Sequence, residues 1–208
     1  MNKLKYIFGI DEAGRGPLAG PVAVGVACVP VDFDWRLIPG VNDSKKVTEK
    51  NRFAIFLRAK MLRKQKIINF SVSLVGASVI DRIGITQAVA LGISRSLHKL
   101  ALDPSTADVR LDGLLEAPHE YKHQKTIIKG DQKEKAIGLA SIVAKVTRDR
   151  YMVRTASRYP QYHFGIHKGY GTLVHRNLIK KIGMSALHRK TFCRNLTEKK
   201  LVKKKVLR

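Results

Sequence analysis

Acidic side chains are scarce in this chain of 208 residues. Sixteen Asp and Glu residues stand against 40 Lys and Arg, which leaves a formal net charge of +24. Folding does not require this imbalance, and the mutual repulsion of like charges opposes it. Nucleic acid is the simplest partner for such a charge. A membrane surface is disfavoured because the sequence contains no basic amphipathic helix with a wide apolar face.

Cysteine and long apolar runs are also scarce. The two cysteines, Cys28 and Cys193, form neither a disulfide framework nor a zinc-binding spacing, which fits a reducing compartment. The first apolar stretch is broken by Gly9 and Asp11, well short of a signal-peptide core. No run reaches the roughly 18 apolar residues of a membrane span. We therefore expect a soluble, cytoplasmic protein that acts as a monomer away from membranes.

The alternation of apolar patterns predicts one α/β domain. Strands are expected at residues 6–12, 21–31, 66–73, 109–112 and 126–129, and helices at 53–61, 85–102, 132–154 and 172–181. This order is typical of a mixed sheet flanked by helices. The domain is expected to cover residues 1–185, followed by a basic tail at 186–208. The tail could contact phosphates or simply form a solvated end.

Four of the scarce acids lie where the predicted strands end. Asp11 and Glu12 close the first strand, Asp112 closes a later one, and Asp131 follows the last. Neighbouring side chains on a strand point to opposite faces, so Asp11 and Glu12 should approach a site from two sides. Asp131 with Glu134 also resembles a helix capping box, and Asp112 before a glycine also fits a simple turn. Asp11 and Glu12 have no such packing explanation.

Convergence of these four acids would require a cation. Two unit charges about 4 Å apart repel by roughly 4 kcal/mol at an effective dielectric of about 20. Oxygen ligands without cysteine or histidine favour Mg²⁺ or Mn²⁺. A metal site of this kind within a basic protein is typical of enzymes that transfer phosphoryl groups in nucleic acid.

Six ordered segments then point to one family. They are IDEAGRGPLAGP at residues 10–21, NDSKK at 42–46, LDG at 111–113, KGD at 129–131, ASIVAKVTRDR at 140–150 and FGIHKGYGT at 164–172. Together they resemble the ribonuclease HII family (type 2 ribonucleases H) over residues 6–185. The resemblance implies a ribonuclease H-like mixed sheet flanked by helices, with a short helical and basic C-terminal extension.

The resemblance also implies an activity. Members of the family are metal-dependent endoribonucleases that hydrolyse the RNA strand of RNA/DNA hybrids. They also cut on the 5′ side of single ribonucleotides in duplex DNA, leaving 3′-hydroxyl and 5′-phosphate ends. The family's catalytic and metal-binding DEDD set matches Asp11, Glu12, Asp112 and Asp131, with two Mg²⁺ or Mn²⁺ ions expected.

Substrate contacts follow from the same resemblance. The backbone of the family's GRG element, here Gly14, Arg15 and Gly16, reads the ribose 2′-hydroxyl. The family tyrosine, here Tyr170, bonds the same 2′-hydroxyl and packs on the next sugar, which favours an RNA-to-DNA junction. In the NDSKK segment, Lys45 and Lys46 resemble the family's phosphate-contacting pair, and Asn42 is expected to bind the substrate. Ser141, Lys145 and Arg148 share one face of a predicted helix and could face either the substrate or water.

Several positions depart from the family pattern or leave another interpretation open. Gly138 stands where the family helix usually has alanine, Val47 where it has leucine, and Leu114 where relatives continue with polar residues. His163 and His167 are four residues apart and are expected to be surface histidines rather than metal ligands.

Two alternative functions remain open. The first is a non-catalytic basic nucleic-acid binder, a function that would not explain why acids lie at three strand ends. A general nuclease would instead cut all-DNA duplexes equally well.

Overall fold

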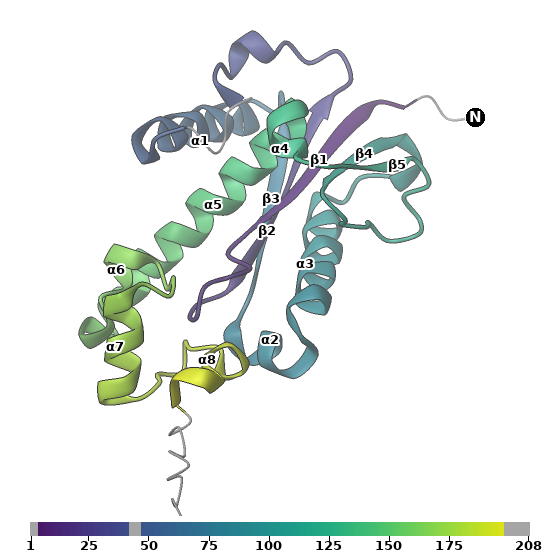
Figure 1. Ribbon diagram of the computed structural model, residues 1–208. Coiled ribbons are helices and arrows are strands. Elements are labelled where there is room, and N and C mark those ends of the chain that lie inside the picture. Colours follow the sequence, from purple (N-terminus) through teal and green to yellow (C-terminus); the bar gives the residue numbers. More distant parts are fainter. Residues whose placement is uncertain (1–3, 42–46, 198–208) are drawn as a thin grey trace, which may run out of the picture.

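The computed structural model describes residues 4–41 and 47–197 and is built on one five-stranded sheet. The strand order is β3-β2-β1-β4-β5 (Figure 1). The strands are β1 (Tyr6–Ala13), β2 (Val22–Pro30), β3 (Asn69–Val75), β4 (Ala107–Asp112) and β5 (Gln124–Ile127). The pairs β1–β2 and β2–β3 are antiparallel, whereas β1–β4 and β4–β5 are parallel. The predicted mixed sheet is confirmed.

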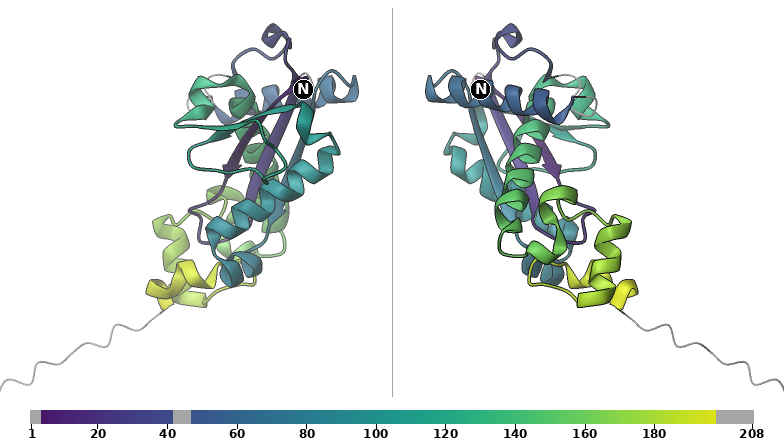
Figure 2. Two further views of the ribbon diagram at one scale, coloured as in Figure 1. Left: turned by 90° about the vertical axis from the view of Figure 1, so that its right-hand side faces the viewer. Right: turned by 90° about the vertical axis from the view of Figure 1, so that its left-hand side faces the viewer.

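Helices cover both faces of this sheet, as the two opposite views of Figure 2 show. One face packs against α3 (Ile85–Leu100), and the other against α5 (Lys135–Ala156) and α1 (Glu49–Lys64). The remaining helices are α2 (Ala77–Ile83), α4 (Gly130–Lys133), α6 (Phe164–His167), α7 (Leu173–Ile182) and α8 (Lys190–Thr197). Within residues 4–41 and 47–197, no helix has the length and hydrophobicity needed to cross a bilayer.

Glycines let α5 approach the sheet closely. A Cβ atom at Gly9 of β1 would lie 2.0 Å from the Ala136 carbonyl carbon, and one at Gly25 of β2 would lie 2.4 Å from the Ala140 oxygen. Real Cβ atoms do not approach this closely, so glycine is required at both strand positions. Gly138 has a similar reason, because its Cβ would lie 2.6 Å from the Val41 carbonyl oxygen. The departure from the family's alanine is therefore a packing requirement of this chain.

The structure also differs from the prediction in places. The helix expected at 132–154 is preceded by a separate short helix, α4, because Glu134 between the two has extended backbone angles. The boundary expected at residue 185 falls inside the folded unit. His188, Arg189 and Cys193 are buried, and the main chain of residues 187–189 pairs with residues 18–20. The strongly basic residues 199–208 lie outside the described part of the chain.

Candidate active site

The acids predicted from the sequence lie along one end of the parallel strands. Asp11 and Glu12 are in the last part of β1, and Asp112 is the last residue of β4. The register pairs Ile10 with Leu111, so the residues that follow, Asp11 and Asp112, lie side by side. Asp131 lies in α4, just after β5. Sites of α/β sheets form at such carboxyl ends.

Asp11 and Glu12 face opposite sides of the sheet, as predicted. The Asp11 carboxylate is buried and is hydrogen-bonded by the Ser141 side chain of α5. Glu12 instead lines a cavity of about 620 Å³ beside α3, together with Arg15 and Asp112. The two acids therefore reach the site from the α5 side and the α3 side.

Burial and neighbouring charges raise the pKa of Asp11 and of Glu12. Burial raises the pKa of Asp11 well above its usual value, the charges of Glu12 and Asp112 add to this, and the Ser141 hydrogen bond opposes it. Burial also raises the pKa of Glu12, where the nearby Arg15 opposes the effect and Asp112 adds to it. Three carboxylates thus repel one another in a partly dehydrated setting, where a cation would be favoured.

Asp112 and Asp131 are linked through the start of α4. The Gly130 amide donates a 2.6 Å hydrogen bond to Asp112 Oδ1, and Asp131 is the next residue, with 1% of its surface exposed. The capping-box interpretation of Asp131 is wrong. Lys129 and Glu134 occupy the N-cap positions of α4 and α5, and the Glu134 carboxylate pairs with Arg110 at 2.6 Å.

A divalent ion fits the chemistry of these donors. Among residues 4–41 and 47–197, no three His, Cys, Asp or Glu side chains form a ready metal site. The donors are nevertheless carboxylate oxygens, the ligands that hard divalent cations prefer. Burial first, and then the charges of Glu12 and Asp112, raise the pKa of Asp11, and a bound cation would offset both effects.

The loop between β1 and β2 borders the acids. Gly14 has φ +91°, a conformation that favours glycine, and its Cβ would lie 2.0 Å from Arg148 Nε. Arg15 Nη1 lies 3.4 Å from Glu12 Oε1. At Gly16 no atom lies within 4 Å of a built Cβ, so the backbone there is open to an approaching ligand. The structure therefore places the GRG element next to Glu12.

Two members of the predicted polar face of α5 lie at the site. Ser141 binds Asp11, and Lys145 Nζ lies 5.1 Å from the ring centroid of Tyr170 and 3.1 Å from Asp149 Oδ1. Tyr170 is 40% exposed, so its ring is available to a ligand. Ser141 and Lys145 thus connect Asp11 with Tyr170 along one helix.

Arg148 requires a correction. Its side chain is fully buried, and its guanidinium donates to the carbonyl oxygens of Ala19, Pro21 and Lys168 at 2.9–3.1 Å. An arginine without exposed surface cannot contact a duplex directly, so the predicted substrate contact gives way to a structural role. Asn42, Lys45 and Lys46 lie outside the described residues.

A histidine cluster next to Tyr170 was missed from the sequence. His167, expected at the surface, stacks on His175 with ring centroids 4.3 Å apart, while His163 is exposed as expected. His175 Nε2 lies 3.0 Å from His188 Nε2. Arg189 was also missed. The histidines and Arg189 come from separate segments that share no periodicity, so no local sequence pattern predicts that they lie together.

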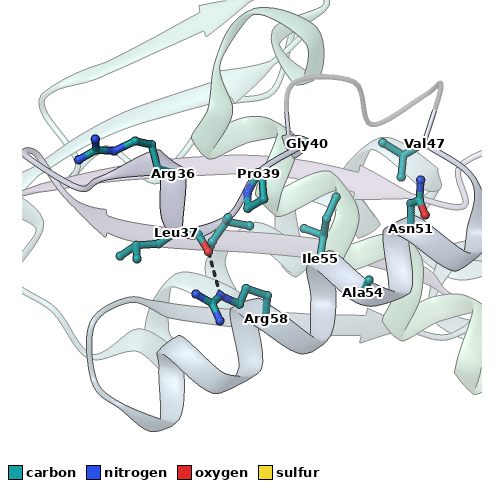
Figure 3. A pocket seen from close by; sticks show the side chains of 10 residues that line it. Arg36, Leu37, Pro39, Gly40, Val47, Asn51, Ala54, Ile55 and Arg58 are labelled. Atoms are coloured by element: carbon teal, nitrogen blue, oxygen red, sulfur yellow. Dashed lines mark hydrogen bonds between the residues drawn. The ribbon is translucent and has the colours of Figure 1, made fainter.

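A second cavity, of about 580 Å³, lies apart from this chemistry. It is formed between residues 36–40 and α1, where Arg58 Nε donates to the Leu37 carbonyl at 3.0 Å (Figure 3). Its lining contains no acidic side chain. The cavity beside Glu12 and Asp112 is therefore the candidate active site.

Solved structures with this architecture define the class. A ribonuclease H2 from Pyrococcus horikoshii OT3 matches with a TM-score of 0.69 and 25% identity, covering 92% of this chain and 96% of that one. Bst-RNase HIII, solved in complex with Mn²⁺, has the same fold, with a TM-score of 0.71 and 17% identity over 95% of this chain and 72% of that one. The fold and the acids at its strand ends define an endonuclease with the ribonuclease H-like fold.

Sequence comparison specifies the family. The profile of the family described as Ribonuclease HII matches residues 8–195. Ribonuclease HII of Caldicellulosiruptor bescii is 44% identical over 192 residues, which cover 92% of this chain and 88% of the relative. That of Endomicrobium trichonymphae is 43% identical, with 89% and 84% covered. The chain belongs to the ribonuclease HII family and is an endonuclease that hydrolyses phosphodiester bonds.

Proposed function

We propose that this protein hydrolyses the RNA strand of RNA/DNA hybrids and cuts on the 5′ side of single ribonucleotides in duplex DNA. The products would carry 3′-hydroxyl and 5′-phosphate ends, and the enzyme would act as a monomer. The observation that carries the proposal is the group formed by Asp11, Glu12 and Asp112 beside the GRG loop, where burial and the neighbouring carboxylates raise the pKa of Asp11 and of Glu12. Membership of the ribonuclease HII family supports it.

The acids would hold two Mg²⁺ or Mn²⁺ ions. Asp11, Glu12, Asp112 and Asp131 are the ligands we propose. Such ions lower the pKa of an attacking water and neutralise the departing 3′-oxygen. The protein's own part is to orient the ligands: Ser141 holds Asp11 from α5, and the Gly130 amide holds Asp112 from α4.

Selectivity for ribose would come from the neighbouring loop. The backbone of Gly14, Arg15 and Gly16 would read the 2′-hydroxyl, the group that distinguishes RNA from DNA. Tyr170 would bond the 2′-hydroxyl and pack on the next sugar, with Lys145 close to its ring. The phosphate contacts of Lys45 and Lys46 and the substrate contact of Asn42 stay predictions from the sequence.

One gel assay tests this function. A duplex with a single ribonucleotide and an all-DNA duplex of the same sequence are incubated with and without Mg²⁺. Mg²⁺-dependent cutting of only the first duplex, on the 5′ side of the ribonucleotide, is expected. Equal cutting of both would indicate a general nuclease, and binding of both without cutting would indicate a non-catalytic binder.

Asp112→Asn should abolish cleavage while leaving the fold and duplex binding intact. The substitution keeps the side-chain shape but removes a charged ligand, and a loss of about 4 kcal/mol of transition-state stabilisation corresponds to about a 1000-fold fall in rate. Single-turnover cleavage and circular dichroism measure the two properties. Asp32→Asn, an exposed acid at the end of β2, is the matched control. Ordinary Mg²⁺-dependent activity in the Asp112 variant would refute the assignment.

A further inference from the structure

The side chain of Arg189 reaches from the segment before α8 into the GRG loop. Its Nη2 donates to the Gly14 carbonyl at 2.7 Å, its Nη1 to the Arg15 carbonyl at 2.7 Å, and its Nε to the Gly20 carbonyl at 3.0 Å. The side chain is fully buried. One guanidinium thus binds three carbonyls of a loop about 170 positions earlier in the chain.

The main chain around Arg189 is itself anchored to that loop. The Arg189 amide donates to Leu18 O and the Gly20 amide donates to Leu187 O, both at 2.8 Å. These two bonds fix where the guanidinium enters. The C-terminal segment and the loop therefore form one unit, with the arginine fork inserted between them.

A buried arginine without an acid partner is costly, so its presence needs a reason. In the part of the chain that the structure describes, no carboxylate lies within ion-pair distance of Arg189. Three backbone carbonyls accept its hydrogen bonds, and the charge of the more distant Asp81 also favours the charged guanidinium. Burial, with Arg148 nearby, lowers its pKa to about 10. A planar fork can bind carbonyls of successive peptides at once, which the single ammonium of lysine does not reproduce.

These bonds determine where the amides of the loop point. The described residues contain no cis peptide bond, and across a trans peptide the carbonyl and the following N–H point in opposite directions. With the Gly14 and Arg15 carbonyls turned towards Arg189, the N–H groups of Arg15 and Gly16 point away from it. Both residues are exposed, and neither N–H has a hydrogen-bond partner among the described residues.

We propose that Arg189 is a positioning residue for ribose recognition, which aims the N–H groups of Arg15 and Gly16 at the 2′-hydroxyl of the substrate. The oxygen of that hydroxyl accepts hydrogen bonds from amides, whereas a deoxyribose offers no such acceptor. The inference rests on the proposed function and adds to it a residue outside the loop and the acids. Arg189 itself touches neither the sugar nor the metal ligands.

The test compares Arg189→Lys and Arg189→Met with the wild-type protein. Binding of a single-ribonucleotide duplex and of the matching all-DNA duplex is measured by fluorescence anisotropy in EDTA, so that no hydrolysis occurs. In both variants we expect the preference for the ribonucleotide to fall by about tenfold, the effect of about one lost hydrogen bond. Affinity for the all-DNA duplex should stay unchanged.

Leu62→Val is the matched control for loss of stability. Leu62 is buried on α1, in the core on the α5 side of the sheet, and contacts neither the loop nor the acids in the hydrogen bonds and cavities described above. A variant destabilised in this way should keep the wild-type preference for the ribonucleotide. Melting temperatures of all variants are recorded, so that a change in preference can be separated from unfolding.

The outcomes separate the inference from the proposed function. If the wild type shows no preference for the ribonucleotide, the proposed function itself fails. If the wild type shows it and folded Arg189→Lys and Arg189→Met keep the full ratio, the inference is wrong while the function stands. A nuclear magnetic resonance titration of the wild type tests the premise that the inference shares with the proposed ribose recognition, and it does so even if both variants unfold. The Arg15 and Gly16 amide signals must shift more with the ribonucleotide duplex than with all-DNA. Equal shifts would overturn the inference together with the loop's proposed role, whereas cleavage by the gel assay would still stand.

Discussion

Asp11 is a buried acid whose nearest charged neighbours include two other acids. Its pKa is raised by burial and by the charges of Glu12 and Asp112, while Ser141 opposes the shift. When such a carboxylate is ionised and no cation is bound to it, it destabilises the folded protein. At the scale of single residues, catalytic potential and a stability cost are therefore properties of the same side chain.

Asp11→Asn should raise the melting temperature of the metal-free protein at pH 7. The folded-state pKa lies above the unfolded value, so ionisation at neutral pH costs stability, and the amide removes that cost. Each kcal/mol relieved corresponds to roughly 2–4 °C in a domain of this size. Differential scanning fluorimetry in EDTA measures the shift.

Added Mg²⁺ supplies the second half of this experiment. An ion that binds only the folded state stabilises it by RT ln(1 + c/Kd), where c is the free ion concentration, so the melting temperature rises as c exceeds Kd. We expect Mg²⁺ to stabilise the wild type and the Asp32→Asn control, and to have a much smaller effect on Asp11→Asn. Equal stabilisation of all three proteins would contradict the assignment of Asp11 as a ligand.

The elements around α7 carry a second buried titratable group. His175 Nδ1 donates to the Tyr170 carbonyl at 2.9 Å, so its Nε2 accepts from His188 Nε2 at 3.0 Å. His188 Nδ1 in turn accepts from the Ser185 amide at 2.8 Å. Each ring is held neutral in one tautomer. The cluster joins α7 and the segment before α8 to the Tyr170 loop.

Stability should fall on acidification because of this cluster. Burial lowers the pKa of His175 and of His188 to about 4. Since unfolded histidine titrates near 6.5, the unfolded state binds more protons between about pH 4 and 6.5, and stability is lost as the pH falls through this window. The slope can reach about 1.4 kcal/mol per pH unit for each histidine. Urea unfolding from pH 7 to 5 measures it.

Substitutions assign that slope to the cluster. His188→Phe removes one buried titrating group and should make the free energy of unfolding less dependent on pH below 6.5. His119→Gln is the control, because the His119 side chain is 94% exposed and should leave the slope unchanged. A slope that His188→Phe does not alter would show that the acid sensitivity arises elsewhere.

At the scale of the whole molecule, a net charge of +24 surrounds a small group of acids. The net positive charge favours association with nucleic acid at long range, whereas Asp11, Glu12 and Asp112 lie at the carboxyl ends of β1 and β4. Long-range attraction and local chemistry thus depend on different residues. This separation allows catalytic variants to bind as tightly as the wild type.

Duplex affinity should fall steeply with salt, and equally so in the wild type and Asp112→Asn. Binding through Lys and Arg releases the counterions that were condensed on the phosphates, and added salt opposes this release. A protein that contacts about 6–10 phosphates therefore loses a factor of roughly 10³–10⁵ in affinity when the salt rises from about 50 to 200 mM. Anisotropy titrations in EDTA at several salt concentrations give the slope. A markedly different slope for Asp112→Asn would show that this aspartate shapes the phosphate-binding surface itself.

The sequence by itself determined the mixed sheet and the positions of the acids. Strand and helix periods are local properties, and Asp11, Glu12 and Asp112 close strands that could be recognised from apolar runs of 4–11 residues. Gly14, which the resemblance marked as part of the GRG element, has a φ of +91°, a conformation that favours glycine. Each of these features depends on neighbours close in the chain.

Only the tertiary structure decided what Arg148, His188 and Arg189 do. On a helix face Arg148 looked like a group for solvent or substrate, and Arg189 looked like the start of a basic tail. Both are buried because carbonyls of the β1–β2 loop meet them in space, at distances of 2.7–3.1 Å. A buried charge is tolerated only where other groups supply its hydrogen bonds. Here those groups belong to distant segments of the chain, so no local sequence pattern predicts the contact.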